Sequence, residues 1–249
     1  MTNMDMGAAM TLLYGGIDRQ GPGDDTFTIN LLKRLPLLPP NPSIADLGCG
    51  TGAGSLLLAR FFDANVLCVD LLQGFLSTLE EKAKAAGLGH LVKPLKADMG
   101  ALGLPEGSLD LLWSEGAAYN LTFKGALERW RPLLAEGGIA TISEMNWFGN
   151  ERPADGGRYW TNVYPTIASE AENQERSKGL GFDVLFTERL PAQAWWQNYY
   201  DPLLAHADKL EAEAPPALAE AIREARQETD EFRRSSDFVG YTFYVLKAV

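Results

Sequence analysis

Short apolar runs alternate along this chain with longer segments in which apolar residues recur at helical spacing. The apolar runs predict five strands, over residues 43–47, 66–70, 91–97, 109–114 and 138–144. The periodic segments predict helices over residues 52–62, 72–86 and 125–134. Strands joined in succession by helices favour a parallel sheet with right-handed crossovers, so the pattern predicts an α/β fold.

The pattern continues differently after residue 150. Residues 182–189 and 241–248 again read as strands, and residues 191–238 between them begin with aromatic side chains and continue with charged residues at helical spacing. We interpret residues 191–238 as a helical insertion. A chain of 249 residues is long enough to bury one large core, so we expect a single domain over residues 1–249.

The first predicted strand leads into a loop rich in glycine, "DLGCGTGAG", which contains Gly48, Gly50 and Gly52. In α/β sheets a ligand binds beyond the carboxyl ends of the strands, and a glycine-rich first turn lets the backbone approach it closely. The loop also fits the dinucleotide pattern G-x-G-x-x-G/A, with Asp70 near the distance expected for a ribose-binding acid. No Gly-Lys-Ser/Thr follows the glycines, which excludes a phosphate-binding P-loop.

The charge of Asp46 separates the two cofactor classes that remain. Asp46 stands two residues before Gly48 and would repel the pyrophosphate of a dinucleotide. S-adenosylmethionine carries an ammonium and a sulfonium and has no phosphate, so a carboxylate there would attract it. Asp70, at the end of the second strand, would then accept hydrogen bonds from the two ribose hydroxyls. The pattern favours a cationic nucleoside.

Four segments resemble the successive motifs of class I S-adenosylmethionine-dependent methyltransferases: "DLGCGTG", "VLCVDLL", "KADMGALGLPEGSLDLLWSEGAAYNL" and "LLAEGGIATISE". The resemblance covers residues 44–144. The segments "RQGPGDD", "WSEGAAYN" and "YTFYVLKA" further resemble bacterial small-molecule methyltransferases of the ubiquinone-biosynthesis-like type.

The resemblance implies a Rossmann-like, doubly wound sheet of seven strands, mostly parallel, with the last strand antiparallel. It implies that Asp70 and Leu71 contact the ribose side, that Asp98 and Met99 lie beside the adenine, and that Ser114 and Glu115 lie beneath the methionine portion. In similar enzymes an N-terminal segment closes over the cofactor, which here points to Tyr14, Arg19 and Gly23. The product would be S-adenosylhomocysteine.

Catalytic and acceptor-binding residues follow from the strand ends. Methyl transfer from a sulfonium needs mainly alignment, and a base is required only if the accepting atom holds a proton. The candidates for such a base are Glu115 and Glu144. The residues expected to line the acceptor pocket are Tyr119, Asn120, Asn146, Trp147, Trp196, Tyr200 and Tyr241. The aromatic start of the insertion serves either as a substrate lid or as packing.

Aromatic faces suit a planar acceptor as well as an amine, so O-, N- and C-methylation all stay open. The net charge of −11 disfavours nucleic acid as a partner, and no apolar run is long enough for a membrane span. With two cysteines, no disulfide framework and no signal-peptide pattern, we expect a cytoplasmic protein that acts on a small molecule. No metal site is predicted, and the sequence leaves the oligomeric state open. An NAD-dependent oxidoreductase and a non-catalytic binding module are the alternatives.

Overall fold

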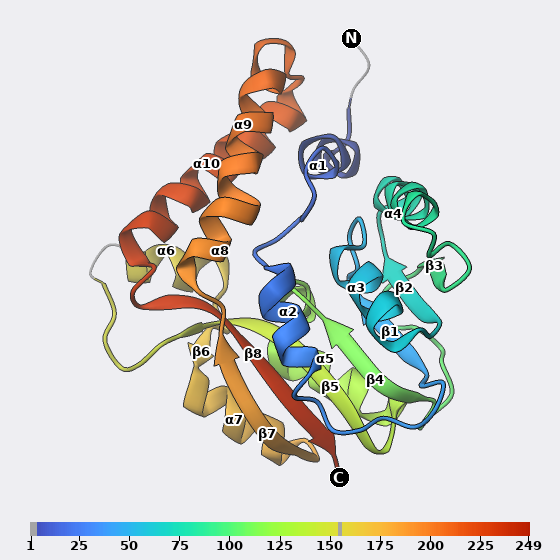
Figure 1. Cartoon of the computed structure of the whole chain (residues 1–249). Helices are drawn as coiled ribbons and strands as arrows, with labels where there is room; N and C mark the ends of the chain where they lie inside the picture. The colour runs from blue at the N-terminus through green and yellow to red at the C-terminus, as the bar shows by residue number, and fades with distance from the viewer. Residues whose placement is uncertain (1–3, 154–155) are drawn as a thin grey trace.

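The computed structural model describes residues 4–153 and 156–249 and contains a central sheet covered by helices on both faces (Figure 1). The strands are β1 (Ile44–Leu47), β2 (Val66–Asp70), β3 (Val92–Lys96), β4 (Leu109–Ser114), β5 (Leu134–Trp147), β7 (Phe182–Arg189) and β8 (Val239–Ala248). They lie in the order β3-β2-β1-β4-β5-β8-β7, and β8 is antiparallel to both of its neighbours. The predicted fold class is confirmed. The short β6 (Ala168–Ser169), which pairs with β5, adds to the seven strands expected.

Helices cover the two faces of the sheet in two groups. In Figure 1, α2 (Asp25–Leu32) and α3 (Ala53–Phe62) lie in front of the sheet, and α5 (Phe123–Trp130) and α7 (Glu170–Gly179) lie behind it. The remaining helices of the first two thirds of the chain are α1 (Met6–Gly15), α4 (Gln73–Ala85) and α6 (Gly156–Val163), with 3₁₀ turns η1 (Ala118–Leu121) and η2 (Arg131–Leu133).

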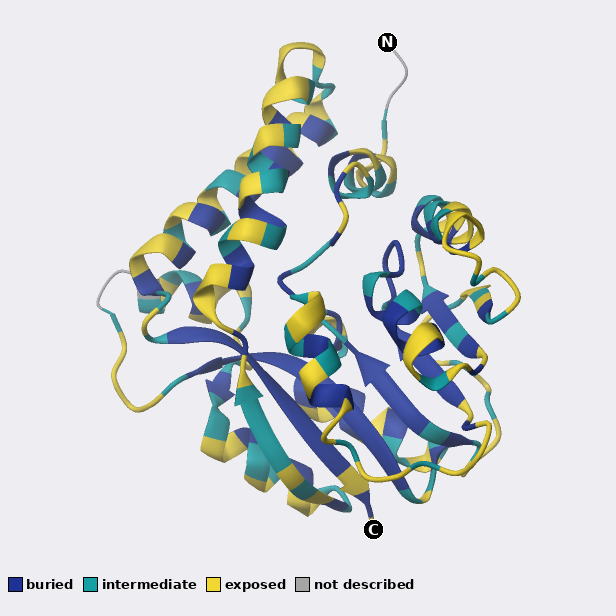
Figure 2. Ribbon diagram, viewed as in Figure 1, coloured by how far each residue is buried: buried dark blue, intermediate teal, exposed yellow. Residues whose placement is uncertain are grey.

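Alternation along the strands divides the apolar core into two layers. In β1, Ile44 belongs to the layer with Leu58 of α3, whereas Ala45 and Leu47 belong to the layer with Leu127 of α5. This follows from the period of two in a strand, which sends successive side chains to opposite faces. Every residue of β1 is buried, as expected for a parallel strand covered on both faces (Figure 2).

Side-chain caps begin the helices that the sequence analysis did not predict. Asp5 accepts from the backbone N–H of Ala8 at the start of α1, and Asp24 accepts from that of Phe27 at the start of α2. Ser169 and Glu172 form a capping box at the start of α7. These caps satisfy N–H groups that a helix leaves unpaired in its first turn. Helix α6 and the two-residue β6 also lie outside the predicted elements.

Strand β5 is longer than the predicted residues 138–144, because it pairs with β8 from Ile139 opposite Lys247 to Trp147 opposite Val239. The extension at residues 145–147 is therefore defined by a partner about a hundred residues later in the chain, and at the other end Leu134 pairs with Leu109 of β4. At the other side of the sheet β3 contains Pro94, which cannot donate a ladder hydrogen bond; β3 is an edge strand, where proline is tolerated.

Residues 191–238 form a helical pair that rises beyond the carboxyl ends of the parallel strands (Figure 1). The segment consists of α8 (Ala192–Trp195), the π-helical turn η3 (Trp196–Tyr200), α9 (Asp201–Leu210), the 3₁₀ turn η4 (Glu211–Glu213) and α10 (Pro216–Ser235). Helix α1 packs against α9 and α10. No helix in the described part of the chain is long and apolar enough to cross a membrane.

Candidate active site

The glycine loop is a tight turn between β1 and α3. Gly48 and Gly50 have φ of 76° and 54°, a backbone conformation that side-chain-bearing residues rarely adopt. The N–H groups of Gly48 and Cys49 both donate to the Val69 carbonyl, each at 2.9 Å, and hold the loop against the end of β2. A Cβ on Gly48 would lie 2.2 Å from the Cβ of Ala117, so the site has no room for a larger residue there.

Asp70 ends β2 and is held by the backbone on both sides. Its Oδ2 accepts from the N–H of Gly50 and its Oδ1 from that of Leu72, both at 2.9 Å. Burial raises the pKa of Asp70, and these backbone N–H groups oppose that shift. The carboxyl group is thus fixed at the edge of a cavity while each oxygen keeps acceptor capacity, which a ribose diol requires. Its role in ribose binding stays a prediction.

Asp46 is more deeply enclosed than the sequence suggests. Only 2% of its surface is exposed, and its Oδ2 accepts from the Ser55 hydroxyl at 2.6 Å. Burial raises the pKa of Asp46 to about 7, against the effect of the Ser55 hydrogen bond. At neutral pH this residue therefore carries part of a charge rather than the full negative charge on which the cofactor argument relied.

The segment before α2 lies over the glycine loop and is tied to it. Gln20 accepts from the N–H of Thr51 at 2.7 Å and donates to the carbonyls of Tyr14 and Ile17. Arg19 donates to Glu115 at 2.9 Å and to Asp25 at 2.7 Å, and it is buried. Gln20 is a site residue that the sequence analysis missed, because no local pattern connects it to a loop thirty residues later.

Gly23 makes room for this ion pair. A Cβ at Gly23 would lie 2.2 Å from Glu115 Oε1 and 2.3 Å from Arg19 Nη1. The carbonyl of Gly23 accepts from Asn198 at 2.9 Å. We predicted a cofactor contact for Gly23, but the structure turns it toward the ion pair and η3, and it does not line the cavity.

The two carboxylates proposed as bases lie in different surroundings. Glu115 is paired with Arg19, and its second oxygen accepts from the indole N–H of Trp113 at 3.4 Å. Glu144 is 2% exposed and does not line the cavity. Burial raises the pKa of Glu144 to about 8, opposed by a hydrogen bond from Tyr164, and its Oε2 has no partner among the described residues. Glu144 is therefore linked to the cavity through Tyr164, which lines it.

A cavity of about 1210 Å³ joins the glycine loop to the helical pair. One part, here called the cofactor end, is lined by Gly48, Gly50, Asp70, Leu71, Asp98, Met99 and Glu115. The other part, here called the aromatic chamber, is lined by Tyr14, Tyr119, Tyr159, Trp160, Tyr164, Trp195, Tyr199 and Tyr241. Asp46, Arg19 and Asn120, also predicted from the sequence, line the same cavity.

Several residues predicted for the site do not line the cavity. Some have polar groups that are hydrogen-bonded inside the sheet, and others face a different helix or strand. Ser114 donates to the Leu47 carbonyl at 2.9 Å. Asn146 donates to Thr242 at 3.1 Å and accepts from the hydroxyl of Tyr244. A Cβ on Gly52 would point at Leu79 of α4. The predicted residues outside the cavity lining are Gly23, Gly52, Ser114, Glu144, Asn146, Trp147, Trp196 and Tyr200.

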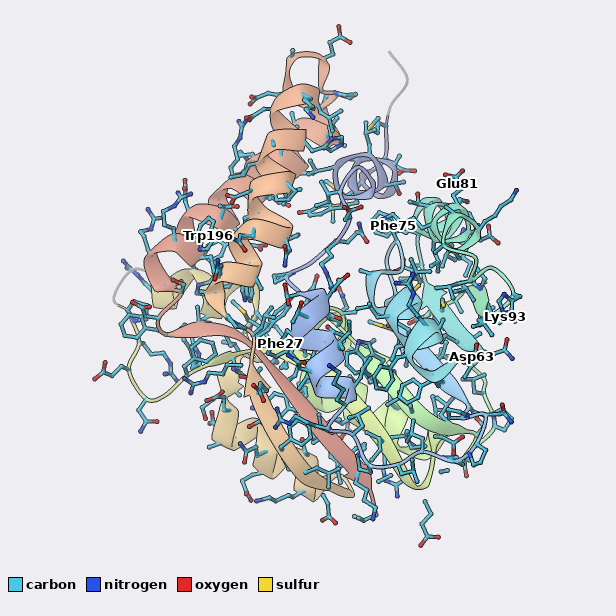
Figure 3. All side chains as sticks on the ribbon, in the orientation of Figure 1. Phe27, Asp63, Phe75, Glu81, Lys93 and Trp196 are labelled. Atoms are coloured by element: carbon cyan, nitrogen blue, oxygen red, sulfur yellow. The ribbon has the colours of Figure 1, made fainter. Side chains whose placement is uncertain are left out.

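Trp196 and Tyr200 were predicted to line the acceptor pocket, but in the structure the residue before each of them lines the cavity instead. Tyr200 donates to Glu228 of α10 at 2.8 Å, and Trp196 packs on Phe232 of the same helix. Figure 3 shows Trp196 on the helical pair formed by residues 191–238. The preceding residue of each pair, Trp195 and Tyr199, lines the cavity. Residues four apart share a face of a helix, so both pairs are consistent with helical spacing, and the sequence does not tell which face meets the cavity.

The sheet order, the glycine loop at the end of β1 and the acid at the end of β2 together define a Rossmann-like enzyme fold that binds a nucleoside cofactor. Residues 44–138 match the family model described as a methyltransferase domain. This part of the chain is therefore a methyltransferase domain. The narrower, ubiquinone-biosynthesis-like resemblance stays a prediction.

Known proteins resemble the chain in sequence over part of its length and in fold over nearly all of it. Phosphoethanolamine N-methyltransferase 1 of Arabidopsis thaliana is 32% identical over 108 residues, 43% of this chain and 22% of that protein. Across the first curated relatives, the chain spans from about a fifth to about half of their length.

The structure of an S-adenosylmethionine-dependent methyltransferase from Geobacter sulfurreducens, in complex with S-adenosylhomocysteine, has a TM-score of 0.81 and 20% identity, with 100% of both chains covered. The [4+2]-cyclase SpnF has a TM-score of 0.76 and 20% identity, over 96% of this chain and 91% of that one. At such identities these two structures show the fold alone.

Proposed function

We propose that this protein binds S-adenosylmethionine and transfers its methyl group to a small organic acceptor. The observation that carries the proposal is the single cavity in which the cofactor end, built on the glycine loop and Asp70, opens into the aromatic chamber. A nucleoside cofactor and a second organic molecule can therefore occupy one continuous space. The net charge of −11 supports a small molecule rather than nucleic acid as acceptor.

The residues present fit this cofactor. Gly48 and Gly50 let Ala117 and Gln20 pack directly against the loop, where a Cβ would collide with them, and the loop itself lines the cavity. We assign Asp70 to the ribose and Asp98 and Met99 to the adenine side. When bound, S-adenosylmethionine supplies a methyl group on an electrophilic sulfonium.

Charge at the cavity argues against a dinucleotide even though Asp46 is partly protonated. Of the charged residues that line the described cavity, six are acidic and two are basic: Asp46, Asp70, Asp98, Glu115, Glu224 and Glu228 against Arg19 and Arg223. Arg19 is already shared between Glu115 and Asp25, and Arg223 is paired with Glu220. A pyrophosphate would find few cations to neutralise it, whereas a sulfonium is well matched.

The chain's own contribution to catalysis is position and exclusion of water. The wall formed by residues 191–238, together with α1 and α6, covers the cavity above the sheet edge, and we propose that it acts as the acceptor lid. Glu115 fixes Arg19 and the N-terminal segment. Glu144 accepts from Tyr164, whose hydroxyl also accepts from the Phe123 N–H at 3.1 Å, so we propose that Glu144 positions Tyr164 rather than acting as a base.

The test combines binding with turnover. Isothermal titration with S-adenosylhomocysteine and with NAD separates the methyltransferase from an oxidoreductase: we expect the first to bind and the second not to. Formation of S-adenosylhomocysteine from S-adenosylmethionine is then followed across a panel of amines, phenols and carboxylic acids. Binding without turnover on any acceptor would favour a non-catalytic module, and preference for NAD would contradict the proposal outright.

A further inference from the structure

One carboxylate stands among the rings of the aromatic chamber. Glu228, on the inner side of α10, lines the cavity, and its Oε1 accepts from the hydroxyl of Tyr200 at 2.8 Å. Burial and then the charge of Glu228 raise the pKa of Tyr14, Tyr159 and Tyr200, which come from α1, α6 and η3. Three separate elements thus bring neutral phenol rings to the same carboxylate.

Within the described part of the chain, no cation is paired with Glu228. Among the described residues, no salt bridge involves Glu228, and the hydroxyl of Tyr200 is the only donor found for it. Burial raises the pKa of Glu228, which means that its ionised form lacks compensation in the chain. A second carboxylate, Glu224, lines the cavity one turn earlier on the same helix.

The rings are arranged as walls around this point. Tyr14 stacks beside Tyr199 with centroids 6.5 Å apart, and Trp195 meets Tyr241 at 4.6 Å. Tyr241 also approaches the cofactor end, because a Cβ on Gly116 would lie 3.5 Å from its ring. The chamber is therefore continuous with the place where the methyl group would arrive.

We propose that the methyl acceptor is an aliphatic amine, held in the aromatic chamber by the tyrosine and tryptophan rings and by the carboxylate of Glu228. This inference rests on the proposed function, because it names the acceptor for that reaction. Aromatic faces and a desolvated carboxylate are the groups that bind organic ammonium ions. They would repel a carboxylate or phosphate acceptor, and the two basic side chains in the described cavity lining, Arg19 and Arg223, are already paired with carboxylates.

The movement of charge in the reaction favours an amine over a phenolate. The amine enters as its free base, having left its proton on water, and its lone pair forms the new N–C bond. The S–C bond breaks and its electron pair stays on sulfur. Positive charge therefore leaves sulfur and appears on nitrogen, inside the chamber, where Glu228 and the ring faces stabilise it more in the transition state than in the ground state. A phenolate would lose its charge in the same step and gain nothing from Glu228.

Choline and its neutral isostere 3,3-dimethylbutan-1-ol are suitable probes, since choline resembles a methylated product and has no lone pair on nitrogen to react. Titration of each into the protein saturated with S-adenosylhomocysteine should show choline binding at least tenfold more tightly than the alcohol. Equal affinities would overturn the inference. The choline titration is repeated without S-adenosylhomocysteine: a protein that binds choline but not S-adenosylhomocysteine contradicts the proposed function alone, and the reverse result contradicts the amine alone.

Glu228→Gln keeps an acceptor for the Tyr200 hydroxyl and removes the charge. We expect a tenfold or greater loss of choline affinity, with the alcohol and S-adenosylhomocysteine affinities unchanged. Asp230→Asn is the matched control, because Asp230 lies on the same helix but is exposed and pairs with Arg233; its choline affinity should stay within twofold of wild type. Unchanged choline binding in Glu228→Gln would leave Glu228 a structural partner of Tyr200 and sink the inference.

If Glu228→Gln fails to fold, as judged by its melting curve, Tyr159→Leu tests the ring faces instead. This change should weaken choline several-fold and leave the alcohol unaffected, and no effect on choline would count against the chamber. Turnover gives the last readout: amines should be the acceptors that yield S-adenosylhomocysteine in the panel. Turnover confined to phenols or to carboxylic acids would overturn the amine and leave the methyltransferase standing.

Discussion

The two ends of the cavity are built in different ways. At the cofactor end the backbone makes the site: Gly48 and Gly50 take positive φ, and Asp70 is held by two backbone N–H groups. In the aromatic chamber side chains make the site, and they come mainly from α1, α6, α8, η3 and strand β8, with Glu228 from α10, elements far apart in the chain. The cofactor end therefore depends on a short stretch of sequence, and the chamber depends on how distant helices pack.

Electrostatics differ between the ends as well. At the cofactor end two carboxylates are compensated, Asp70 by two backbone N–H groups and Glu115 by Arg19, whereas burial raises the pKa of Asp46 despite its hydrogen bond from Ser55. Around the chamber, Glu144 is buried and Glu228 is half-buried, each accepts from one tyrosine hydroxyl, and loss of solvent raises the pKa of both. The ionised form of Glu228 is thus destabilised by desolvation, and a cationic ligand in the chamber would stabilise it.

The largest expected effect is on the free energy of unfolding, and it comes from the desolvation of Glu144. Its pKa is about 8 in the folded chain against an ordinary value of 4.5, so the contribution of Glu144 to stability is greatest below about pH 4.5 and is lost as pH rises toward 8. Glu144→Gln lacks that loss. Between pH 4.5 and 9 its free energy of unfolding should therefore gain roughly 3–5 kcal/mol relative to wild type.

Urea denaturation at the two pH values measures this difference, and groups common to both proteins, Asp46 and Glu228 among them, cancel. A difference between wild type and Glu144→Gln that does not change with pH would show that Glu144 is not desolvated in the folded chain.

The second prediction concerns the acid at the cofactor end. Asp70→Asn removes the charged acceptor proposed for the ribose and should weaken S-adenosylhomocysteine by roughly 1.5–3 kcal/mol, the usual range for hydrogen bonds to a charged group. Asp63→Asn is the matched control, since Asp63 is exposed and lies away from the cavity (Figure 3). Equal affinities for the two variants, measured by titration calorimetry, would remove Asp70 from the cofactor site.

A third prediction asks how strictly the backbone defines the cofactor end. Gly48 and Gly87 have nearly equal φ, 76° and 73°, but a Cβ would strike Ala117 at the first position and meet open space at the second. Gly87→Ala should cost about 1 kcal/mol of strain, and Gly48→Ala about 1–2 kcal/mol more. Thermal unfolding of the two variants provides the comparison. Identical losses would mean that the loop can move away from Ala117.

The smallest effect, on the acceptor KM, should come from a substitution at Trp196, an aromatic residue outside the cavity lining. Trp196 packs on Phe232 and under the guanidinium of Arg233, outside the cavity lining. Trp196→Ala should leave the acceptor KM within about threefold of wild type, under 1 kcal/mol, whereas Tyr199→Ala should raise it further, because Tyr199 lines the chamber. Kinetics with a turned-over amine, together with melting temperatures, separate the two. A larger KM effect from Trp196→Ala would restore the lid residue predicted from the sequence.

The sheet and the cofactor end could be predicted because their signals are local. Alternation and glycine spacing locate β1, β2 and the loop between them, and strands β2, β4 and β7 have the predicted bounds. The strand that begins or ends by pairing with a distant partner, such as β5 with β8, is predicted less well. Residue types locate a strand along the sequence, whereas its length depends on the strand with which it pairs.

The chamber could be predicted only in outline. The aromatic start of the insertion indicates a wall, but the choice between Trp195 and Trp196 depends on the rotation of one helix against another. Asn146 and Trp147 follow a strand end in sequence, yet pairing of β5 with β8 keeps them inside the sheet. Glu228 sits among ordinary charged residues of α10, and nothing local distinguishes it from Asp230.

The π-helical turn η3 joins α8 to α9 within one continuous helix, and it has a consequence for how the acceptor could change during evolution. A π turn accommodates one residue more than an α turn, so it sets the phase between the helical segments on either side. Loss of a single residue there would rotate α8 by about 100° relative to α9 and turn a different aromatic face toward the cavity. The acceptor wall can thus be respecified by an insertion or deletion, while the glycine loop and Asp70 stay untouched.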